Sequence, residues 1–280
     1  MKPGEPFLAP VAAVEPGSRT VEVSGLRGGR AFAGLDRVAE EVPVALEFNG
    51  ISHAVMLATP RDLEDFALGF SLAEGILDKP VDLYDTEIEE SGEGITLRLE
   101  IAASCFARLK QYRRNLAGRT GCGLCGTESL AQALRPVPRV AHGFSVEAEA
   151  ISRGLQAMRA QQVLQQATGA VHAAAWCNAE GVVGLLREDV GRHNALDKLA
   201  GALARAQVAT DAGFALVTSR ASYEMVQKAA MAGIGILAAI SAPTTLAIAT
   251  AQAANLALAG FARERDMVLY AHPERVRHNS

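Results

Sequence analysis

Alternating apolar and polar residues mark the first strands that we expect along this chain. Residues 42–48 alternate as a half-buried strand does, and residues 52–58 resume the alternation. The dipeptide between them, Asn49-Gly50, is typical of a two-residue β-hairpin turn. The pattern therefore predicts an antiparallel pair of strands.

A helix is expected next, because apolar residues recur at helical spacing from Leu63 to Phe70. Thr59 is expected at its N-cap and Pro60 at its first position, where each residue type is favoured. The pattern then predicts strands at 86–90 and 95–101 and a basic helical connector at 105–116.

The second half of the chain alternates between apolar runs and longer helical patterns separated by turn residues. Strands that alternate with helices predict an α/β domain built in layers around a mostly parallel sheet. The expected strands are 172–177, 182–186, 215–218, 234–240 and 267–270, and the expected helices are 127–134, 151–166, 194–206, 222–232 and 244–259.

These patterns divide the chain into three parts. Residues 1–30 are rich in Pro and Gly, which predicts an extended arm with a short strand at 20–23. Residues 31–116 are expected to form a smaller α+β domain. Residues 117–280 are expected to form the larger α/β domain.

The composition allows a large core and excludes some classes of partner. Of the 280 residues, 49% are hydrophobic and 21% are charged, as in globular proteins. The formal net charge of −4 gives no general attraction to nucleic acid or to anionic membranes, so we expect neither as a partner. An anionic ligand would need a local site.

One stretch resembles a membrane span, since no charged residue lies between Lys228 and Arg263. Pro243, Gln252 and Asn255 interrupt it, which favours a buried strand, a turn and a buried helix. Four cysteines in so long a chain do not indicate a secreted disulfide scaffold, and the first 18 residues lack the apolar run of a signal peptide. We therefore expect a cytoplasmic protein.

The chemically most distinctive segment is Gly121-Cys122-Gly123-Leu124-Cys125-Gly126. Its three glycines predict a loop that carries the two thiols of Cys122 and Cys125. A zinc site would need two further ligands, and no second Cys-x-x-Cys exists. A dithiol redox centre and a sulfur carrier, which holds sulfur as a persulfide, both fit the residues. Cys105 and Cys177 are expected to be inert buried thiols.

Two other segments are candidates for binding or catalysis. Ser219, Arg220 and Ser222 follow a strand and precede a helix, where backbone N–H groups favour a phosphate, although Ser222 could simply cap the helix. Residues 187–194, Arg-Glu-Asp-Val-Gly-Arg-His-Asn, place basic residues at a helix start, where the helix dipole disfavours them. A functional role is favoured there over a surface ion-pair network. A lone His172 at a strand start is more often structural than catalytic.

The motifs taken together resemble the FdhD family of formate dehydrogenase accessory sulfurtransferases. The matching segments keep the family's order, from about residue 41 to about residue 276. They are ATPRDLEDFALGF at 58–70, GRTGCGLCG at 118–126, TGAVHAAA at 168–175, EDVGRHNALDK at 188–198, TSRASYEMVQK at 218–228 and SAPTTL at 241–246.

This resemblance implies a function. Family members take sulfur from a cysteine desulfurase and deliver it to the molybdenum cofactor, in its bis-molybdopterin guanine dinucleotide form, before insertion into formate dehydrogenase. The persulfide cysteine maps to Cys122, and Cys125 matches the second thiol. The resemblance also implies a homodimer, and GDP is expected to mimic the cofactor.

The resemblance implies a cofactor-binding segment as well. That segment follows Gly260 and comprises Phe261, Ala262, Arg263, Glu264, Arg265 and Asp266, of which Arg265 and Asp266 depart from many relatives. Several phosphates on such a cofactor would suit Ser219, Arg220 and Ser222, and we expect Arg220 and Ser222 to line its site.

The implied fold of the larger domain is cytidine-deaminase-like, which raises a rival enzymatic function. A zinc deaminase needs His-x-Glu followed by Pro-Cys-x-x-Cys. Here the cysteine pair comes first without a preceding Pro, and His172-Ala173-Ala174 lacks the Glu. We therefore expect no resident metal and a sulfurtransferase. The alternatives are a zinc-stabilised chaperone of the cofactor and a dithiol oxidoreductase.

Overall fold

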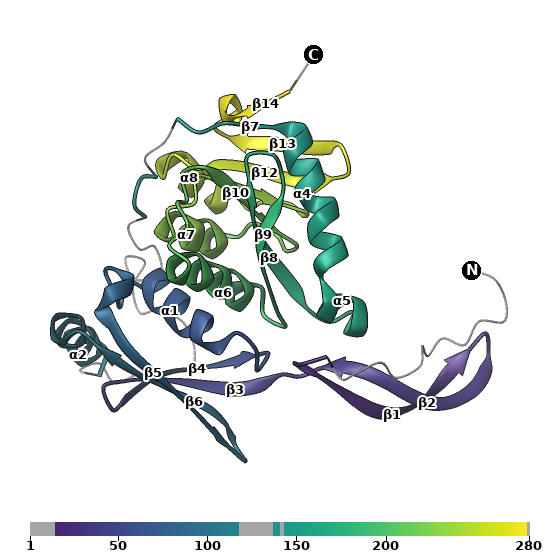
Figure 1. Cartoon of the computed structure of the whole chain (residues 1–280), viewed down its shortest axis with the longest axis horizontal. Helices are drawn as coiled ribbons and strands as arrows, with labels where there is room; N and C mark the ends of the chain where they lie inside the picture. Colours follow the sequence, from purple (N-terminus) through teal and green to yellow (C-terminus); the bar gives the residue numbers. More distant parts are fainter. Residues whose placement is uncertain (1–14, 118–136, 141–142, 279–280) are drawn as a thin grey trace.

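The computed structural model describes residues 15–117, 137–140 and 143–278, and side-chain positions are described outside 112–117. The fold is mixed α/β, with two main sheets and helices packed on both (Figure 1). The Cys122–Cys125 loop and the helix expected at 127–134 lie outside the described residues.

A long hairpin precedes the first main sheet. Strands β1 (Ser18–Arg27) and β2 (Arg30–Ala39) pair along their whole length around Gly28-Gly29, both of which have positive φ. The strand expected at 20–23 is therefore longer and continues into a partner beyond residue 30. Buried and exposed positions alternate only weakly along these two strands. The reason is that the hairpin extends away from the sheets, so neither of its faces is fully covered (Figure 1).

The smaller main sheet has the strand order β4-β3-β6-β5 and is covered on one face by α1 and α2. Both Asn49 and Gly50 have positive φ, as the predicted hairpin turn requires. The elements are β3 (Val42–Phe48), β4 (Ile51–Ala58), α1 (Leu63–Ala73), a 3-10 turn η1 (Pro80–Asp82), β5 (Leu83–Ser91), β6 (Gly94–Ile101) and α2 (Ala103–Ala117).

The prediction that Thr59 caps α1 is wrong. The helix begins at Leu63, and Asp62 precedes it with a φ of 53°. Thr59 is instead fully buried. Its hydroxyl accepts the N–H of Val190, which directly follows a strand of the larger sheet, at 3.2 Å. Tertiary contacts have overridden the local capping preference.

The larger main sheet has six strands in the order β13-β12-β11-β10-β8-β9. The prediction of a mostly parallel sheet is wrong, since only the β10–β11 and β11–β12 pairs are parallel. Hairpins β8–β9 and β12–β13, and the β8–β10 pair, are antiparallel. The strands are β8 (His172–Asn178), β9 (Val183–Asp189), β10 (Gly213–Val217), β11 (Ile236–Ala239), β12 (Ala257–Arg263) and β13 (Asp266–Ala271).

Helices cover both faces of this sheet. Alternate residues along its strands face α4 (Ala148–Gln161) on one side and α6 (Arg192–Arg205), α7 (Tyr223–Met231) and α8 (Thr245–Ala253) on the other. At one end β7 (Val146–Glu147) pairs with β14 (Val276–Arg277), which follows the 3-10 turn η2 (Pro273–Arg275). No helix in the described part of the chain is long and apolar enough to cross a membrane.

Two predicted helices are shorter than expected. The helix expected at 244–259 ends at Ala253, and its last predicted residues belong to strand β12, where an alanine-rich run is buried on both sides. The helix expected at 151–166 is two helices, α4 and α5 (Val163–Thr168), with Gln162 between them.

Helices α1 and α6 join the two main sheets at a close crossing. A Cβ atom on Gly69 would lie 1.7 Å from the carbonyl oxygen of Asp197, and one on Gly201 would lie 1.9 Å from that of Asp65. The absence of side chains at both glycines is therefore what lets the two helix backbones touch.

Candidate functional site

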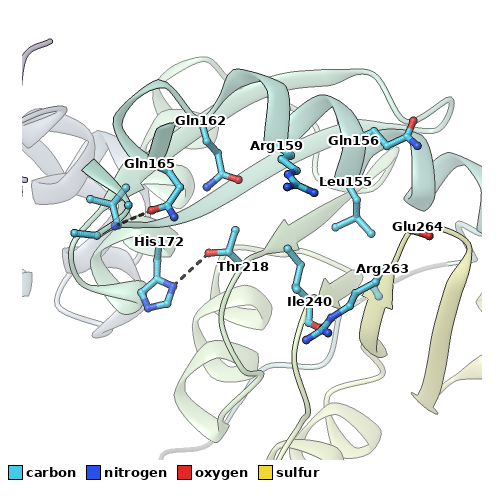
Figure 2. A pocket seen from close by; sticks show the side chains of 14 residues that line it. Leu155, Gln156, Arg159, Gln162, Gln165, His172, Thr218, Ile240, Arg263 and Glu264 are labelled. Carbon is cyan, nitrogen blue, oxygen red and sulfur yellow. Dashed lines mark hydrogen bonds between the residues drawn. The ribbon is translucent and has the colours of Figure 1, made fainter. Parts of the chain in front are cut away.

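A cavity of about 750 Å³ opens beneath α4 and α5, where strands β10 and β11 end (Figure 2). This position, beyond the carboxyl ends of parallel strands, is a common place for ligands in α/β sheets. Its walls come from the segment α4–α5–β8, from the ends of β10 and β11, and from the β12–β13 hairpin. They comprise Leu155, Gln156, Arg159, Gln162, Gln165, Gly169, Ala170, Val171, His172, Thr218, Ile240, Ala262, Arg263 and Glu264.

The roof of the cavity depends on the break between α4 and α5. Gln162 leaves the helical conformation with ψ of 74°, and α5 restarts in a new direction. The carboxylate of buried Glu188, on β9, accepts the N–H groups of Leu164 at 2.9 Å and Gln165 at 2.8 Å. Glu188 therefore satisfies the free donors at the start of α5 and fixes the break.

Ionisation of Glu188 has an electrostatic cost. Burial raises the pKa of its carboxyl above the ordinary value, although the two backbone N–H groups and Arg61 oppose the shift. Glu188 is therefore a buried carboxylate held by specific hydrogen bonds, unlike an acidic residue on the solvent-exposed surface.

Two arginines give one end of the cavity a positive charge. Arg263 donates its Nε–H to the carbonyl of Ile240 at 3.3 Å. The Arg159 carbonyl accepts from Gln166 Nε2 at 3.0 Å, but the Arg159 guanidinium has no hydrogen bond or ion pair with a described residue. Glu264 provides the opposing carboxylate. Guanidinium N–H groups that lack a protein partner at a cavity wall can bind phosphate oxygens. Glu264 itself has a φ of 52°, a strained conformation for a residue other than glycine.

Neutral polar groups line the other end of the cavity. His172 Nδ1 lies 3.3 Å from the Thr218 hydroxyl, which also accepts the N–H of Ala173 (Figure 2). Burial, and then the charge of Arg192, lower the pKa of His172, while Asp189 opposes them. His172 is therefore uncharged at neutral pH and can act as a hydrogen-bonding group.

Three residues of the predicted cofactor segment line this cavity, namely Ala262, Arg263 and Glu264. The remaining residues of the segment lie on the same β12–β13 hairpin but do not line it. They are Phe261, Arg265 and Asp266, and all three are exposed.

The residues predicted to bind phosphate after β10 also lie outside the cavity wall. Ser219 is buried and donates its hydroxyl to the carbonyl of Arg220, whose own side chain is exposed. Ser222 holds the N-cap position of α7, but its hydroxyl makes no capping bond. The cavity wall includes their neighbour Thr218 instead.

The charged segment 187–194 connects the two sheets; Glu188, Asp189 and Asn194 are buried, and its other residues are half-buried. Asp189 and Lys198 are both fully buried and form an ion pair at 2.6 Å. Lys198 also donates to the carbonyl of Thr59 at 2.9 Å, and Asp189 accepts the N–H of Thr59 at 3.0 Å. His193 lies 2.9 Å from Glu224, on the exposed side of the segment.

Two cysteines have the structural role that was predicted. Cys105 and Cys177 are both buried, and burial raises the pKa of Cys177 to about 12, which makes it a poor nucleophile. Among the described residues, one group has the donors for a metal ion, Asp78, Asp82 and Cys105. Arg108 donates to Asp78 at 3.1 Å and lies 3.7 Å from the Cys105 sulfur, so a cation is already present there.

The sequence interpretation missed two cavity residues, Arg159 on α4 and Gln162 between α4 and α5. A signal was present in the helical pattern. Ile151, Leu155 and Met158 form a buried stripe, and Gln162 holds the next position on that stripe. A polar residue in an apolar stripe marks either a structural bond or a ligand contact.

Comparisons with known proteins give a consistent result. The model of the FdhD/NarQ family matches residues 39–277. The chain is 60% identical to the sulfur carrier protein FdhD of Bordetella petrii, over 90% of this chain and 91% of that one. It is 59% identical to the protein of the same name from Variovorax paradoxus, over 94% and 95% of the two chains.

A solved structure also shares the fold. It comes from Desulfotalea psychrophila and is described as that of a candidate formate dehydrogenase accessory protein. The TM-score is 0.72 with 23% identity, over 94% of this chain and all of that one. At this identity the likeness concerns the fold alone.

Proposed function

We propose that this chain, which belongs to the FdhD/NarQ family, is a sulfur carrier that sulfurates a molybdenum cofactor for formate dehydrogenase. The observation that carries the proposal is identity of 55% or more, over nearly the whole chain, to several proteins named sulfur carrier protein FdhD. A further example, from Cupriavidus necator, is 56% identical over 98% of this chain.

The chemistry of the transfer requires a thiolate that can hold and release one sulfur atom. The Cys122 thiolate attacks the outer sulfur of a persulfide on a cysteine desulfurase. A sulfur–sulfur bond forms at Cys122, the bond on the donor breaks, and the donor cysteine leaves as a thiolate. Delivery of that sulfur as sulfide needs two electrons, which Cys125 can supply: its thiolate attacks the Cys122 sulfur, a Cys122–Cys125 disulfide forms, and the outer sulfur leaves as hydrosulfide for the cofactor.

The cavity under α4 is the proposed site for part of the cargo. The cargo, bis-molybdopterin guanine dinucleotide, presents phosphates, guanine bases and pterin rings. Arg159 and Arg263 provide cations for phosphate, and the neutral polar end provides groups for a ring edge. Arg220 and Ser222 would contact the cargo outside this cavity.

The remaining expectations rest on the family resemblance. They are a homodimer, a cysteine desulfurase as sulfur donor, formate dehydrogenase as recipient and a cytoplasmic location. Helices on both faces of a mixed sheet agree with the implied cytidine-deaminase-like fold.

Intact-protein mass spectrometry tests sulfur transfer. After incubation with a cysteine desulfurase and free cysteine, we expect the mass to rise by one sulfur atom. The gain should be absent in Cys122→Ala and present in the matched variant Cys105→Ala, whose thiol is buried. Stoichiometric zinc without the gain would instead support the chaperone, and a reversible loss of two hydrogens alone would support the oxidoreductase.

Calorimetric titration with GDP tests the cargo site. Arg159→Gln should weaken GDP binding about tenfold, because one charge-assisted bond to phosphate is lost. Arg153→Gln is the matched control, since Arg153 lies on the same helix, is exposed and donates to the Glu180 carbonyl away from the cavity. Equal GDP affinity in wild type and Arg159→Gln would reject this location for the nucleotide.

A further inference from the structure

The smaller main sheet has one face on which no helix of the described chain packs. Val44, Leu46 and Phe48 of β3 are buried on the other face, in the core beneath α1 and α2. Because alternate residues of a strand point to opposite faces, the registers of the four strands define the side chains of this open face. Its apolar residues are Pro43, Ala45, Val55 and Leu57, and its charged residues are Glu47, Asp85, Glu87, Glu89, Arg98 and Glu100.

The open face has an apolar half and an acidic half. On edge strand β4, Val55 and Leu57 are 61% and 57% exposed. On the side of β5 and β6 one guanidinium serves all the carboxylates, since Arg98 lies 2.6 Å from Glu89 and 3.9 Å from Glu87. The acidic half therefore keeps a negative charge. Exposed apolar residues beside charge of one sign are typical of a protein-binding surface.

The β1–β2 hairpin also has an uncovered apolar face. Leu26 and Leu35 are 76% and 43% exposed, and the strand register places Ala31 and Ala33 on the same face. The hairpin extends away from both main sheets, and its main contact with the rest of the described chain is with α5 at its base (Figure 1). A two-stranded hairpin without further packing is marginally stable in water. A binding partner would supply that packing.

The tip of this hairpin is basic. Arg27 and Arg30 flank the Gly28-Gly29 turn, and both are exposed. On the second face of the hairpin the Phe32 ring fills the space above a glycine, and the Arg27 guanidinium lies 5.0 Å from the centre of that ring. The hairpin thus covers part of its second face with its own side chains and leaves the leucine face and the tip for a partner.

We propose that the β1–β2 hairpin of one protomer lies across the open face of a second copy, and that the exchange is mutual. A hairpin laid across the strands sets its leucine face on Val55 and Leu57 and its tip on the acidic half. Arg27 and Arg30 then pair with carboxylates such as that of Glu89. The inference rests on the homodimer expected under the proposed function and assigns the surfaces that form it.

The shape of the molecule suits a mutual exchange. The hairpin and the smaller sheet lie at opposite ends of the long axis, both on the side away from the larger sheet (Figure 1). One two-fold rotation can therefore bring each hairpin onto the sheet of the other copy, which closes the assembly as a dimer. Ten-residue strands make a ribbon about 30 Å long and about 10 Å wide. Two such contacts bury about 1,200 Å², which is enough for a stable interface.

Sedimentation equilibrium of two charge-reversed variants tests the exchange. The hairpin variant carries Arg27→Glu and Arg30→Glu, and the sheet variant carries Glu87→Lys and Glu89→Lys. Each variant alone places like charges together in both contacts, so its dimer Kd should rise about a hundredfold above that of wild type. An equal mixture of the two pairs opposite charges in both contacts, so a heterodimer with a Kd near the wild-type value should form.

A double variant with the same charge change as the hairpin variant is the control. Arg139→Glu with Arg153→Glu alters two exposed residues of the larger domain, so it should dimerise as wild type does. Recovery on mixing shows that both charge-reversed chains are folded. Three results would each overturn the proposal: a monomeric wild type, wild-type dimerisation by each variant alone, or a mixture that stays monomeric.

The interface and the sulfur-carrier function fail separately, because sulfur gain at Cys122 is measured by mass. A monomeric chain that gains sulfur would reject the hairpin exchange alone. A dimer with the expected charge behaviour that gains no sulfur would reject the sulfur carrier and leave the interface in place.

Discussion

Single residues show how strongly burial governs charge in this protein. Lys228 bonds both carboxylate oxygens of fully buried Asp197, at 2.8 and 2.9 Å, and lies 3.5 Å from Glu74. Burial raises the pKa of Asp197 from 3.8 to about 6, although Lys228 opposes the shift. Burial would lower the pKa of Lys228, but Asp197 and Glu74 outweigh it and raise that pKa.

A pH-dependent stability follows from Asp197. Between about pH 3.8 and 6 the folded protein binds a proton that the unfolded chain does not, so this group stabilises the fold as pH falls through that window. Asp197→Asn resembles the protonated side chain but cannot titrate, so it lacks this stabilisation on acidification. Wild type should therefore gain up to about 3 kcal/mol in unfolding free energy relative to Asp197→Asn as pH falls from 6 to 4.

Urea unfolding at several pH values measures this difference. Asp211→Asn is the control, because Asp211 is exposed and should change the unfolding free energy little at any pH. A stability difference between wild type and Asp197→Asn that stays constant from pH 4 to 6 would contradict the assignment.

At the residue scale, local turn chemistry was predictable and long-range contacts were not. Asn49-Gly50 adopts the expected turn because its requirement for positive φ is local. The role of Thr59 could not be predicted, because its partners Asp189 and Lys198 are more than a hundred residues away. Arg159 and Gln162 were missed since their importance depends on a cavity that several distant segments build.

Elements meet through close backbone contact at the crossing of α1 and α6. Gly201→Ala should destabilise the protein by about 3 kcal/mol, because its Cβ would overlap the Asp65 carbonyl and also lie 2.9 Å from the Gly69 nitrogen. Backbone atoms on both sides leave little room to adjust.

The control for this substitution is Gly184→Ala on β9. The nearest heavy atom to a Cβ there is 4.0 Å away, so we expect a change below about 1 kcal/mol. Urea denaturation of the three proteins measures both effects. Equal stability of Gly201→Ala and wild type would show that the helices can move apart at no cost.

At the scale of elements, periodicity predicted most strands and helices within a few residues. It failed where tertiary contacts decide the end of an element. Glu188 stabilises a new helix start at α5, so a continuous helical pattern is divided at Gln162. The run 257–259 pairs with β11 and β13, so it is a strand although its alanines favour a helix.

At the scale of the whole molecule, buried polar contacts join the two main sheets. The order of elements along the chain was predictable, but strand direction was not, because apolar runs do not distinguish a parallel neighbour from an antiparallel one. The family followed from motif order and is confirmed by the match to residues 39–277. The sulfur-transfer chemistry assigned to Cys122 stays a prediction, since that loop lies outside the described residues.

The end of strand β9 has a consequence for communication across the molecule. Arg187 bonds Asp65 on α1, Glu188 bonds the start of α5, and Asp189 bonds Thr59 and Lys198. Because neighbouring residues of a strand point to opposite faces, three consecutive side chains connect the smaller sheet to the cavity roof. A movement of the smaller sheet relative to the larger one would therefore displace the cavity roof through these three adjacent residues. If a molecule that binds in the cavity shifts this connection, the smaller sheet must respond by the same free energy, because such coupling is reciprocal.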